Sequence, residues 1–378
     1  MVWLEWLRAQ SKKHQAKKSE GEAERIPHTQ ARQGTQNRQG ARKKQEARTR
    51  QESLFDLDTE AIEDFRISGP YTSKNLSVFL IHGKDVPALS DFLTLEEALD
   101  QGKVIVEETG NVSELRIKNL SDKDVFVQSG DVVKGGRQDR ALQFDMILTP
   151  ESGFVPIKAF CVERGRWSRR GLQDVDRFTE AHGHVAYRSM KMAMKYRGDQ
   201  HEVWREVHNT QLRSASNANI PLSKVQNAAS PTSYQLTLET PEVQNAIQGY
   251  VDELSNAPNA THDVIGYAIA INGRVTNIDV YASNVLFVKM WMKLLKASAL
   301  EALGELNSAL GFEAPTTDQV IAIMTDANQE KAQVKAMAGQ STTIMKESKS
   351  NLLFETRDTK SGGSWVHRNY AIKEDEAK

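Results

Sequence analysis

The chain has 378 residues, of which 39% are hydrophobic, and this length allows one large domain or two small ones with a buried core. Its net charge of −1 hides an asymmetry, because residues 1–52 carry 13 Lys or Arg against 6 Asp or Glu and the remainder is acidic. The single cysteine excludes an intramolecular disulfide and a zinc site made of several cysteines. The sequence has no run of the about 20 apolar residues that a membrane span needs and no secretory signal, so we expect a cytoplasmic protein with no membrane partner.

Residues 1–52 are rich in Gln, Lys, Arg and Ala and contain few large apolar residues. Such a segment buries too little surface to offset its ordering entropy, so we expect a disordered basic N-terminal arm. One interpretation is a solvated tail, and the other is an arm that binds nucleic acid through its phosphates. No aromatic residue interleaves the charges after Trp6, which favours the solvated tail.

Residues 53–170 are predicted to be the strand-rich half. Leu54 to Arg66 has the apolar spacing of a short helix, which Gly69-Pro70 would end. Leu76 to His82 is typical of a buried strand, and Thr94 is a predicted N-cap for a helix that stops at Gly102. Further short strands are predicted at 103–108, 113–119, 125–128, 132–134, 140–148 and 156–163. About seven short strands favour an antiparallel sheet folded on itself over βαβ units.

Residues 171–378 are predicted to contain helices and two hairpins, and to form one continuous domain with residues 53–170. The first hairpin, 263–282, turns at Asn272-Gly273, as a type I′ turn requires. The second pairs 351–356 with 364–372, and we expect both hairpins to join or extend the sheet. Helices are predicted at 199–214, 241–254, 284–302 and 317–325, with a loop at 215–235 and no assignment for 328–350. The predicted fold class is α+β, with a largely antiparallel strand-rich N-terminal half packed against this mixed half.

The segment Gly135-Gly136-Arg137-Gln138-Asp139-Arg140 is the first candidate site. Two glycines let backbone amides approach a ligand closely, and Arg137 and Arg140 could clamp a phosphate or carboxylate while Gln138 orients it. The alternative is a glycine-rich bulge at a sheet edge, with both arginines paired to nearby acids. The segment is not a P-loop, because no Lys-Ser or Lys-Thr follows the glycines.

The second candidate site is the segment Cys161 to Trp167, and it follows two apolar segments that read as strands. The two candidate segments could therefore lie at one edge of one sheet. Arg164 would supply charge, Trp167 a ring, and Glu163 a carboxylate that organises the arginines or acts as a catalytic group. Cys161 is a candidate nucleophile or, more commonly for an apolar-flanked cysteine, a small core residue.

Among the histidines, His367 is a candidate base, because strand alternation puts it on one face with Trp365. The pair His182 and His184 has no third ligand at a fixed spacing, so we expect no metal site. The sequence likewise indicates no cofactor.

Five segments, in this order, resemble an uncharacterised bacterial and archaeal domain family: LTLEEALDQGKVIVEE, GDVVKGGRQDR, FCVERGRW, INGRVTNIDVYASNVLFVKMWMKLL and SWVHRNYAI. The family is named for its association with ADP-ribosylglycohydrolase and rhodanese-phosphatase superfamily proteins, and the resemblance runs from about residue 76 to 372. It implies a role near nucleotide or phosphate chemistry without assigning a reaction.

Three hypotheses of function follow. The first is a module that binds a small anionic ligand, nucleotide-like or phosphate-like, through the residues Gly135, Gly136, Arg137, Gln138, Arg140, Arg164 and Trp167. The second is a hydrolase at the same place that uses Glu163 or Cys161 with His367. The third is an interaction protein whose acidic body binds partner proteins and whose basic arm binds nucleic acid. The sequence does not specify the oligomeric state.

Overall fold

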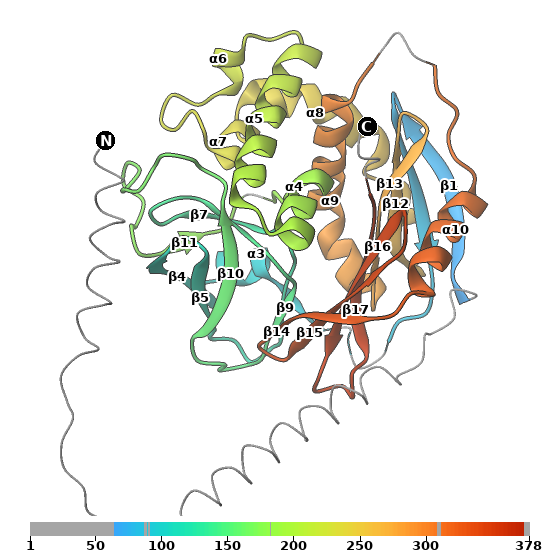
Figure 1. Cartoon of the computed structure of the whole chain (residues 1–378), viewed down its shortest axis with the longest axis horizontal. Helices are drawn as coiled ribbons and strands as arrows, with labels where there is room; N and C mark the ends of the chain where they lie inside the picture. The colour runs from blue at the N-terminus through green and yellow to red at the C-terminus, as the bar shows by residue number, and fades with distance from the viewer. Residues whose placement is uncertain (1–63, 87–88, 90, 182, 308–310, 374–378) are drawn as a thin grey trace, which may run out of the picture. The chain divides into compact units, whose positions relative to one another are not determined.

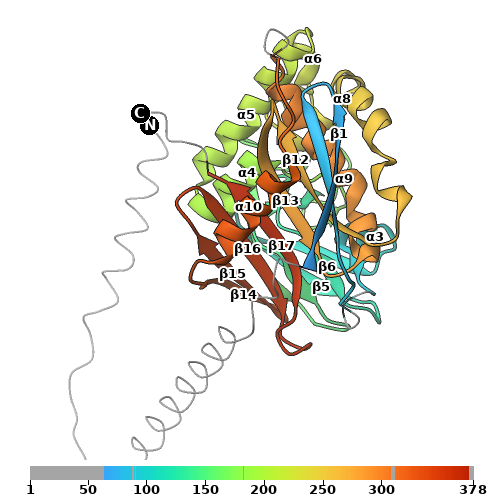
Figure 2. The same ribbon diagram turned by 90° about the vertical axis from the view of Figure 1, so that its right-hand side faces the viewer.

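The computed structural model describes residues 64–86, 89, 91–181, 183–307 and 311–373. Its largest sheet has eight strands in the order β1-β2-β12-β13-β17-β16-β15-β14, and each strand is antiparallel to its neighbours. Figure 2 shows most of these strands side by side. Their bounds are Arg66–Ser73, Leu76–His82, Val264–Ile271, Arg274–Tyr281, Trp365–Ile372, Asn351–Asp358, Ser341–Glu347 and Gln333–Ala338, in that spatial order.

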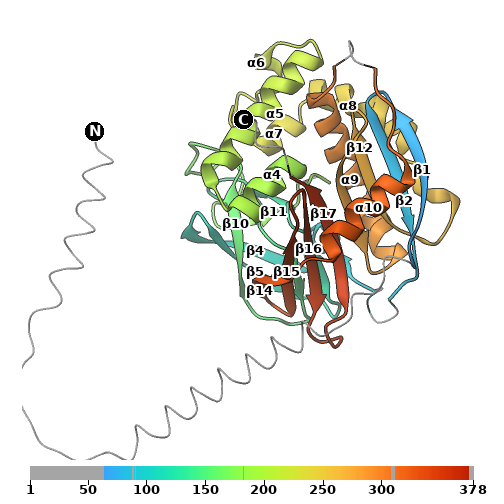
Figure 3. The same ribbon diagram turned by 45° about the vertical axis from the view of Figure 1, so that its right-hand side comes forward.

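Helices cover this large sheet. Helix α9 (Asn284–Gly304) packs on β12 and β13, and α8 (Pro241–Leu254) and α5 (Gln200–Asn217) pack on α9. Helix α10 (Thr317–Asn328) packs on β15, β16 and β17, and Figure 3 shows it in front of these strands while α9 lies behind the sheet. The largest hydrophobic core therefore lies between the sheet and α9, and it includes Leu80, Ile269 and Leu294.

The remaining strands form two smaller sheets with their own core. The six-stranded sheet has the order β11-β7-β8-β10-β5-β4, and the three-stranded sheet has the order β3-β6-β9 (Figure 1). In the same order, the bounds are Phe178–Thr179, Val132–Gly135, Arg140–Leu142, Val155–Cys161, Glu114–Asn119 and Val104–Asn111, and then Leu93–Thr94, Val125–Val127 and Met146–Leu148. The short helix α3 (Leu95–Asp100) closes this core, in which Leu95, Ile117 and Leu142 are buried.

Several short helices connect the two halves. Helix α4 (Arg188–Met192) continues directly into a π-helix, η3 (Ala193–Arg197), before α5 begins. Helices α6 (Leu222–Val225) and α7 (Tyr234–Leu238) precede α8, and a 3₁₀ turn, η4 (Ala257–Ala260), follows it.

The predicted fold class is confirmed, because the molecule is α+β with largely antiparallel strands in the N-terminal half. Both predicted hairpins are present, and Asn272 and Gly273 have φ values of 51° and 76°, as the predicted turn requires. Thr94 caps α3 in a capping box with Glu97.

Three predictions were wrong in detail. Arg66 already belongs to β1, and the Gly69-Pro70 peptide, which is cis, lies within this edge strand at an irregularity in the register. An edge strand tolerates proline because the backbone N–H that proline lacks would face solvent there. Apart from its last residues, the expected helix from Leu54 lies outside the described residues, and so does the expected basic arm. The expected loop at 215–235 contains the end of α5, helix α6 and the start of α7. Residues 328–350, which had no assignment, contain β14 and β15.

The third error concerns the expected single sheet. The strands of residues 53–170 are divided among three sheets, and only β1 and β2 join the C-terminal hairpins. One pair, β3 with β6, is parallel.

Candidate functional site

The two candidate segments meet because β8 and β10 are antiparallel neighbours. Cys161, the last residue of β10, lies opposite Arg140, the first residue of β8. The turn that precedes β8 and the loop that follows β10 therefore leave the same end of the sheet. We call them the glycine turn (135–140) and the arginine loop (162–170). Their predicted convergence at one sheet edge is confirmed by a hydrogen bond of 2.9 Å from the Asp139 amide to Glu163 Oε2.

Two carboxylates and two guanidiniums lie at the centre, and we call them the charge cluster (Asp139, Glu163, Arg166 and Arg170). Arg170 Nη1 donates to Asp139 Oδ2 and to Glu163 Oε1, each at 2.9 Å. Arg166 Nη2 donates to Glu163 Oε2 at 2.6 Å and lies 3.5 Å from Asp139 Oδ1. Both carboxylates have no exposed surface. Each is contacted by both guanidiniums, as buried carboxylates require.

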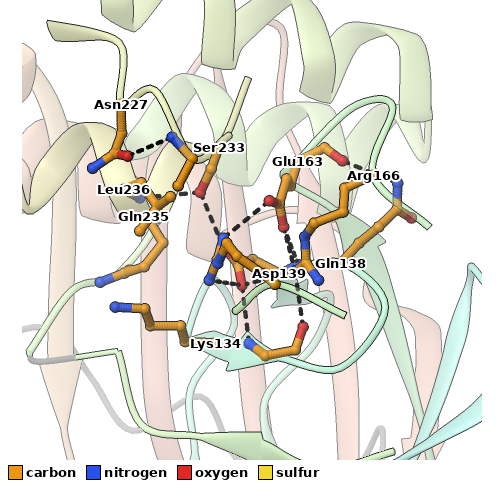
Figure 4. A network of polar contacts seen from close by, with 12 residues as sticks. Lys134, Gln138, Asp139, Glu163, Arg166, Asn227, Ser233, Gln235 and Leu236 are labelled. Atoms are coloured by element: carbon orange, nitrogen blue, oxygen red, sulfur yellow. Dashed lines mark hydrogen bonds and ion pairs between the residues drawn. The ribbon is translucent and has the colours of Figure 1, made fainter. Parts of the chain in front are cut away.

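Further hydrogen bonds tie the charge cluster to the backbone and to the segment before α7. Arg166 donates to the carbonyl oxygens of Gly135 and Gly136 at 3.0 and 2.9 Å. Ser233, the N-cap of α7, donates to Asp139 Oδ2 at 2.9 Å, and Figure 4 shows Asp139 near both Ser233 and Glu163. Gln138 donates to the carbonyl oxygen of Glu163 at 3.0 Å. The glycine turn, the arginine loop and α7 are therefore held as one unit.

Glu163 is a buried carboxylate that stays ionised. Burial raises its pKa, but the hydrogen bonds from Arg166, Ser230 and the Asp139 amide, together with the charge of Arg170, outweigh burial and lower the pKa below its usual value. A carboxylate with a lowered pKa is a poor general acid, and both of its oxygens already accept hydrogen bonds. In this structure the Glu163 carboxylate holds the guanidiniums of Arg166 and Arg170 in place.

Arg140 is completely buried, and its guanidinium binds backbone carbonyl groups inside the protein. Its Nε and Nη1 donate to the carbonyl oxygens of Val112 and Gln138 at 3.2 and 2.9 Å. Its Nη2 lies 3.6 Å from Glu108 Oε1 and makes no hydrogen bond. Burial lowers the pKa of Arg140 despite this neighbouring carboxylate. The Arg140 guanidinium is thus directed into the protein and not toward solvent.

The other predicted cations lie at the surface beside aromatic rings. The Arg137 guanidinium lies 5.4 Å from the centre of the Trp167 ring, and Arg164 lies at the same distance from Trp204. Trp167 is 42% exposed. Within the described part of the chain, neither guanidinium makes a hydrogen bond or an ion pair. The arginines that look alike in the sequence therefore differ in burial: some form buried ion pairs, and others lie at the surface beside rings.

The glycine turn uses its amides internally. The amides of Gly135 and Gly136 donate to Asp139 Oδ1 and to the carbonyl oxygen of Arg177, at 2.9 and 3.0 Å. A Cβ at Gly136, where φ is +50°, would lie 2.3 Å from Phe178 Cζ. The second glycine is therefore required by close packing, and a ligand would meet guanidiniums before it met these amides.

Comparison with known proteins identifies the family. The model of the ARG and Rhodanese-Phosphatase-superfamily-associated Protein domain, ARPP-1, matches residues 64–371. The chain belongs to the ARPP-1 family. No curated protein and no solved structure matches it. The match confirms the predicted family, and it includes every element described above apart from the last residues of the chain.

Cys161 of this ARPP-1 domain is a buried thiol at the end of β10. Its Sγ donates to the carbonyl oxygen of Glu163 at 3.2 Å, and burial raises its pKa. A raised pKa reduces the fraction of thiolate, which is the nucleophilic form.

His367 lies in a different polar cluster, on β17. Its Nδ1 is 2.8 Å from Asp145 Oδ2, its Nε2 is 3.0 Å from Asp279 Oδ1, and its ring stacks on Tyr281 at 4.5 Å. Both ring nitrogens are thus engaged, and none of these partners is Glu163 or Cys161. The structure therefore does not bring His367 into direct contact with Glu163 or Cys161, the other two candidate catalytic residues of the hydrolase hypothesis.

Two further findings concern the described residues of the ARPP-1 domain. They contain no group of three or more His, Cys, Asp or Glu side chains with the geometry of a metal site. Within the same ranges, no helix has the length and the apolar character that crossing a membrane requires.

Two residues of the site had no clear signal in the sequence: Arg170, a member of the charge cluster, and Ser233, which donates a hydrogen bond to it. Arg170 lies in an irregular charged stretch, and Ser233 lies in what reads as a polar loop. A serine three residues before Leu236 fits the pattern of an N-cap, and this was the only available signal for Ser233.

Proposed function

We propose that this ARPP-1 domain binds a small anionic ligand, a nucleotide or another phosphate-bearing molecule, on the surface of the glycine turn and the arginine loop. The observation that carries the proposal is the excess of guanidiniums at this surface. The two segments contain six arginines and two carboxylates. Glu108, which lies beside Arg140, adds a third carboxylate to the group. Three of the six guanidiniums are therefore in excess over the carboxylates. An anion would compensate them.

Arg137, Arg164 and Trp167 are the residues that would contact the ligand. Arg137 and Arg164 have free guanidiniums, which recognise phosphate with two parallel hydrogen bonds. The exposed ring of Trp167 offers a face on which a base can stack, and such stacking contributes about 1–3 kcal/mol per base. The buried charge cluster has a different role, because it fixes the loops that carry these three side chains.

The test is titration calorimetry at low ionic strength with orthophosphate, AMP and ADP-ribose. ADP-ribose is chosen because the family is named for its association with ADP-ribosylglycohydrolase proteins. Arg137→Ala and Arg164→Ala should each weaken binding about tenfold, or about 1.4 kcal/mol. Trp167→Ala should weaken binding of AMP and ADP-ribose and leave orthophosphate unchanged.

Arg205→Ala is the control, because Arg205 is an exposed arginine on α5 that pairs with Glu202. Its substitution should change no affinity. The proposal is refuted if no probe binds the wild-type chain, or if Arg205→Ala weakens binding as much as Arg137→Ala does.

The two other hypotheses have separate readouts in the same samples. A hydrolase would convert ADP-ribose during incubation, which mass spectrometry detects, and Cys161→Ser or Glu163→Gln would abolish the conversion. An interaction with nucleic acid through the basic arm would disappear on deletion of residues 1–52 and would not respond to Arg137→Ala.

A further inference from the structure

A second cleft, away from the arginine loop, is lined by α4, β12, β13 and α9. Lys191, on α4, is one of its lining residues and is only 7% exposed. No described residue lies within hydrogen-bonding or ion-pairing distance of its Nζ atom. The other lysines of this region differ, because Lys195 donates to Asn369 at 3.1 Å and Lys293 pairs with Asp131 at 2.6 Å. A buried ammonium group without a partner is costly, so its position in the wall of a cleft calls for an occupant.

The local backbone is built around the Lys191 side chain. A Cβ at Gly130 would lie 2.9 Å from Lys191 Cε and 3.2 Å from its Cγ, so the glycine leaves the room through which the lysine stem passes. Helix α4 runs directly into the π-helix η3, which carries the second buried lysine, Lys195. Single π-helical turns occur frequently at functional sites. The two buried lysines therefore lie near each other, and of the two only Lys191 lines the cleft.

The carboxylate that attracts Lys191 already accepts hydrogen bonds from other residues. Although burial raises the pKa of Asp279, the charge of Lys191 lowers it. Asp279 accepts hydrogen bonds from Asn277 at Oδ2 and from Asn369 at Oδ1, at 2.7 and 2.9 Å, and its Oδ1 lies 3.0 Å from His367 Nε2. Among the described residues, Lys191 Nζ is therefore left without a direct hydrogen-bond acceptor.

The size of the cleft limits what can enter. The space open to the centre of a water-sized sphere is about 10 Å³, which is room for about one water-sized group. Tyr267 and Ser298 supply hydroxyl groups to its wall, and Arg188 and Glu301 form an ion pair of 3.1 Å between α4 and α9. A single atom or a short planar group fits these limits, and a nucleotide does not.

We propose that this cleft is a binding site for one small monovalent anion, a halide or a short carboxylate, held by Lys191 Nζ. The bound anion accepts a hydrogen bond from Lys191 Nζ and joins α4 to α9 and the large sheet. This site is independent of the surface formed by the glycine turn and the arginine loop, so each of the two proposals can fail without the other.

The first experiment measures the thermal unfolding midpoint while chloride or formate replaces gluconate at constant ionic strength. Gluconate is too large for the cleft, so the midpoint of the wild-type chain should rise as chloride or formate is added. Lys191→Met should remove this rise, and Arg137→Ala should keep it. An equal response to all three anions, or an unchanged rise in Lys191→Met, would overturn the proposal.

A second measurement needs no variant, in case Lys191→Met does not fold. Crystals of the wild-type chain soaked in bromide should show an anomalous peak in contact with Lys191 Nζ. A bromide-soaked crystal without density at this position would overturn the proposal as well.

Discussion

Replacing Glu163 by glutamine should lower the free energy of unfolding far more than breaking an exposed ion pair does. Glu163 accepts hydrogen bonds from Arg166, Arg170 and the Asp139 amide, and its side chain has no exposed surface. Glutamine keeps the shape, but it removes the charge and places an amide donor against one of the two guanidiniums. Removing one partner of a buried ion pair costs about 3–5 kcal/mol, because the remaining charge is left buried and uncompensated.

The assay is urea unfolding followed by circular dichroism, and Glu107→Gln is the matched control. Glu107 Oε2 lies 2.6 Å from Arg116 Nη2, as close as the Glu163 pair, but Arg116 is 50% exposed. Exposed pairs contribute about 0–1 kcal/mol, so the control should lose no more than about 1 kcal/mol. If Glu163→Gln loses as little as Glu107→Gln, the charge cluster does not hold the loops and our account of the site is wrong.

Two other substitutions test the site and the second cluster. Gly136→Ala should cost more than Gly171→Ala in urea unfolding: both glycines have positive φ and share a backbone cost of about 1–2 kcal/mol, but only Gly136 would clash with Phe178, for about 1–3 kcal/mol more. Equal losses would contradict this packing argument. The raised pKa of His367 stabilises the fold fully below pH 6.5, and this stabilisation is lost as the pH rises through the folded-state pKa. Unfolding free energies measured from pH 6 to 9 should show this decline in the wild-type chain and not in His367→Gln, and parallel pH profiles would contradict it.

The elements that the sequence predicted well are those whose signals are local. The turn at Asn272-Gly273, the cap at Thr94 and the helix that begins at Pro241 each depend on a few adjacent residues. Strand pairing does not depend on adjacent residues. In the structure β2 pairs with β12, almost 200 residues away in sequence, and nothing in either strand specifies the other. The edge strand β14 was missed because its alternate side chains Gln333, Lys335 and Met337 are exposed and the others are only partly buried, so its apolar pattern is weak.

The candidate site shows the same division between local and distant information. The convergence of the glycine turn and the arginine loop could be predicted, because two neighbouring strands connect them. The partners of individual arginines could not be predicted, since Arg166 and Arg164 look alike in sequence but face in different directions. Arg166 is tied to Glu163 and to two backbone carbonyls, whereas Arg164 is exposed beside Trp204.

Burial therefore separates two roles among chemically identical side chains, and the separation has a measurable consequence. A guanidinium that already pairs with a buried carboxylate has few hydrogen bonds left to offer a ligand, so changing Arg166 or Arg170 should lower stability first. An exposed guanidinium beside a ring contributes little to stability, so changing Arg137 or Arg164 should lower affinity alone. The two effects act on different equilibria, and the double variant Arg137→Ala with Glu163→Gln should therefore show both changes independently. Strong coupling between them would mean that the surface and the charge cluster form one site, with the ligand reaching the buried carboxylates.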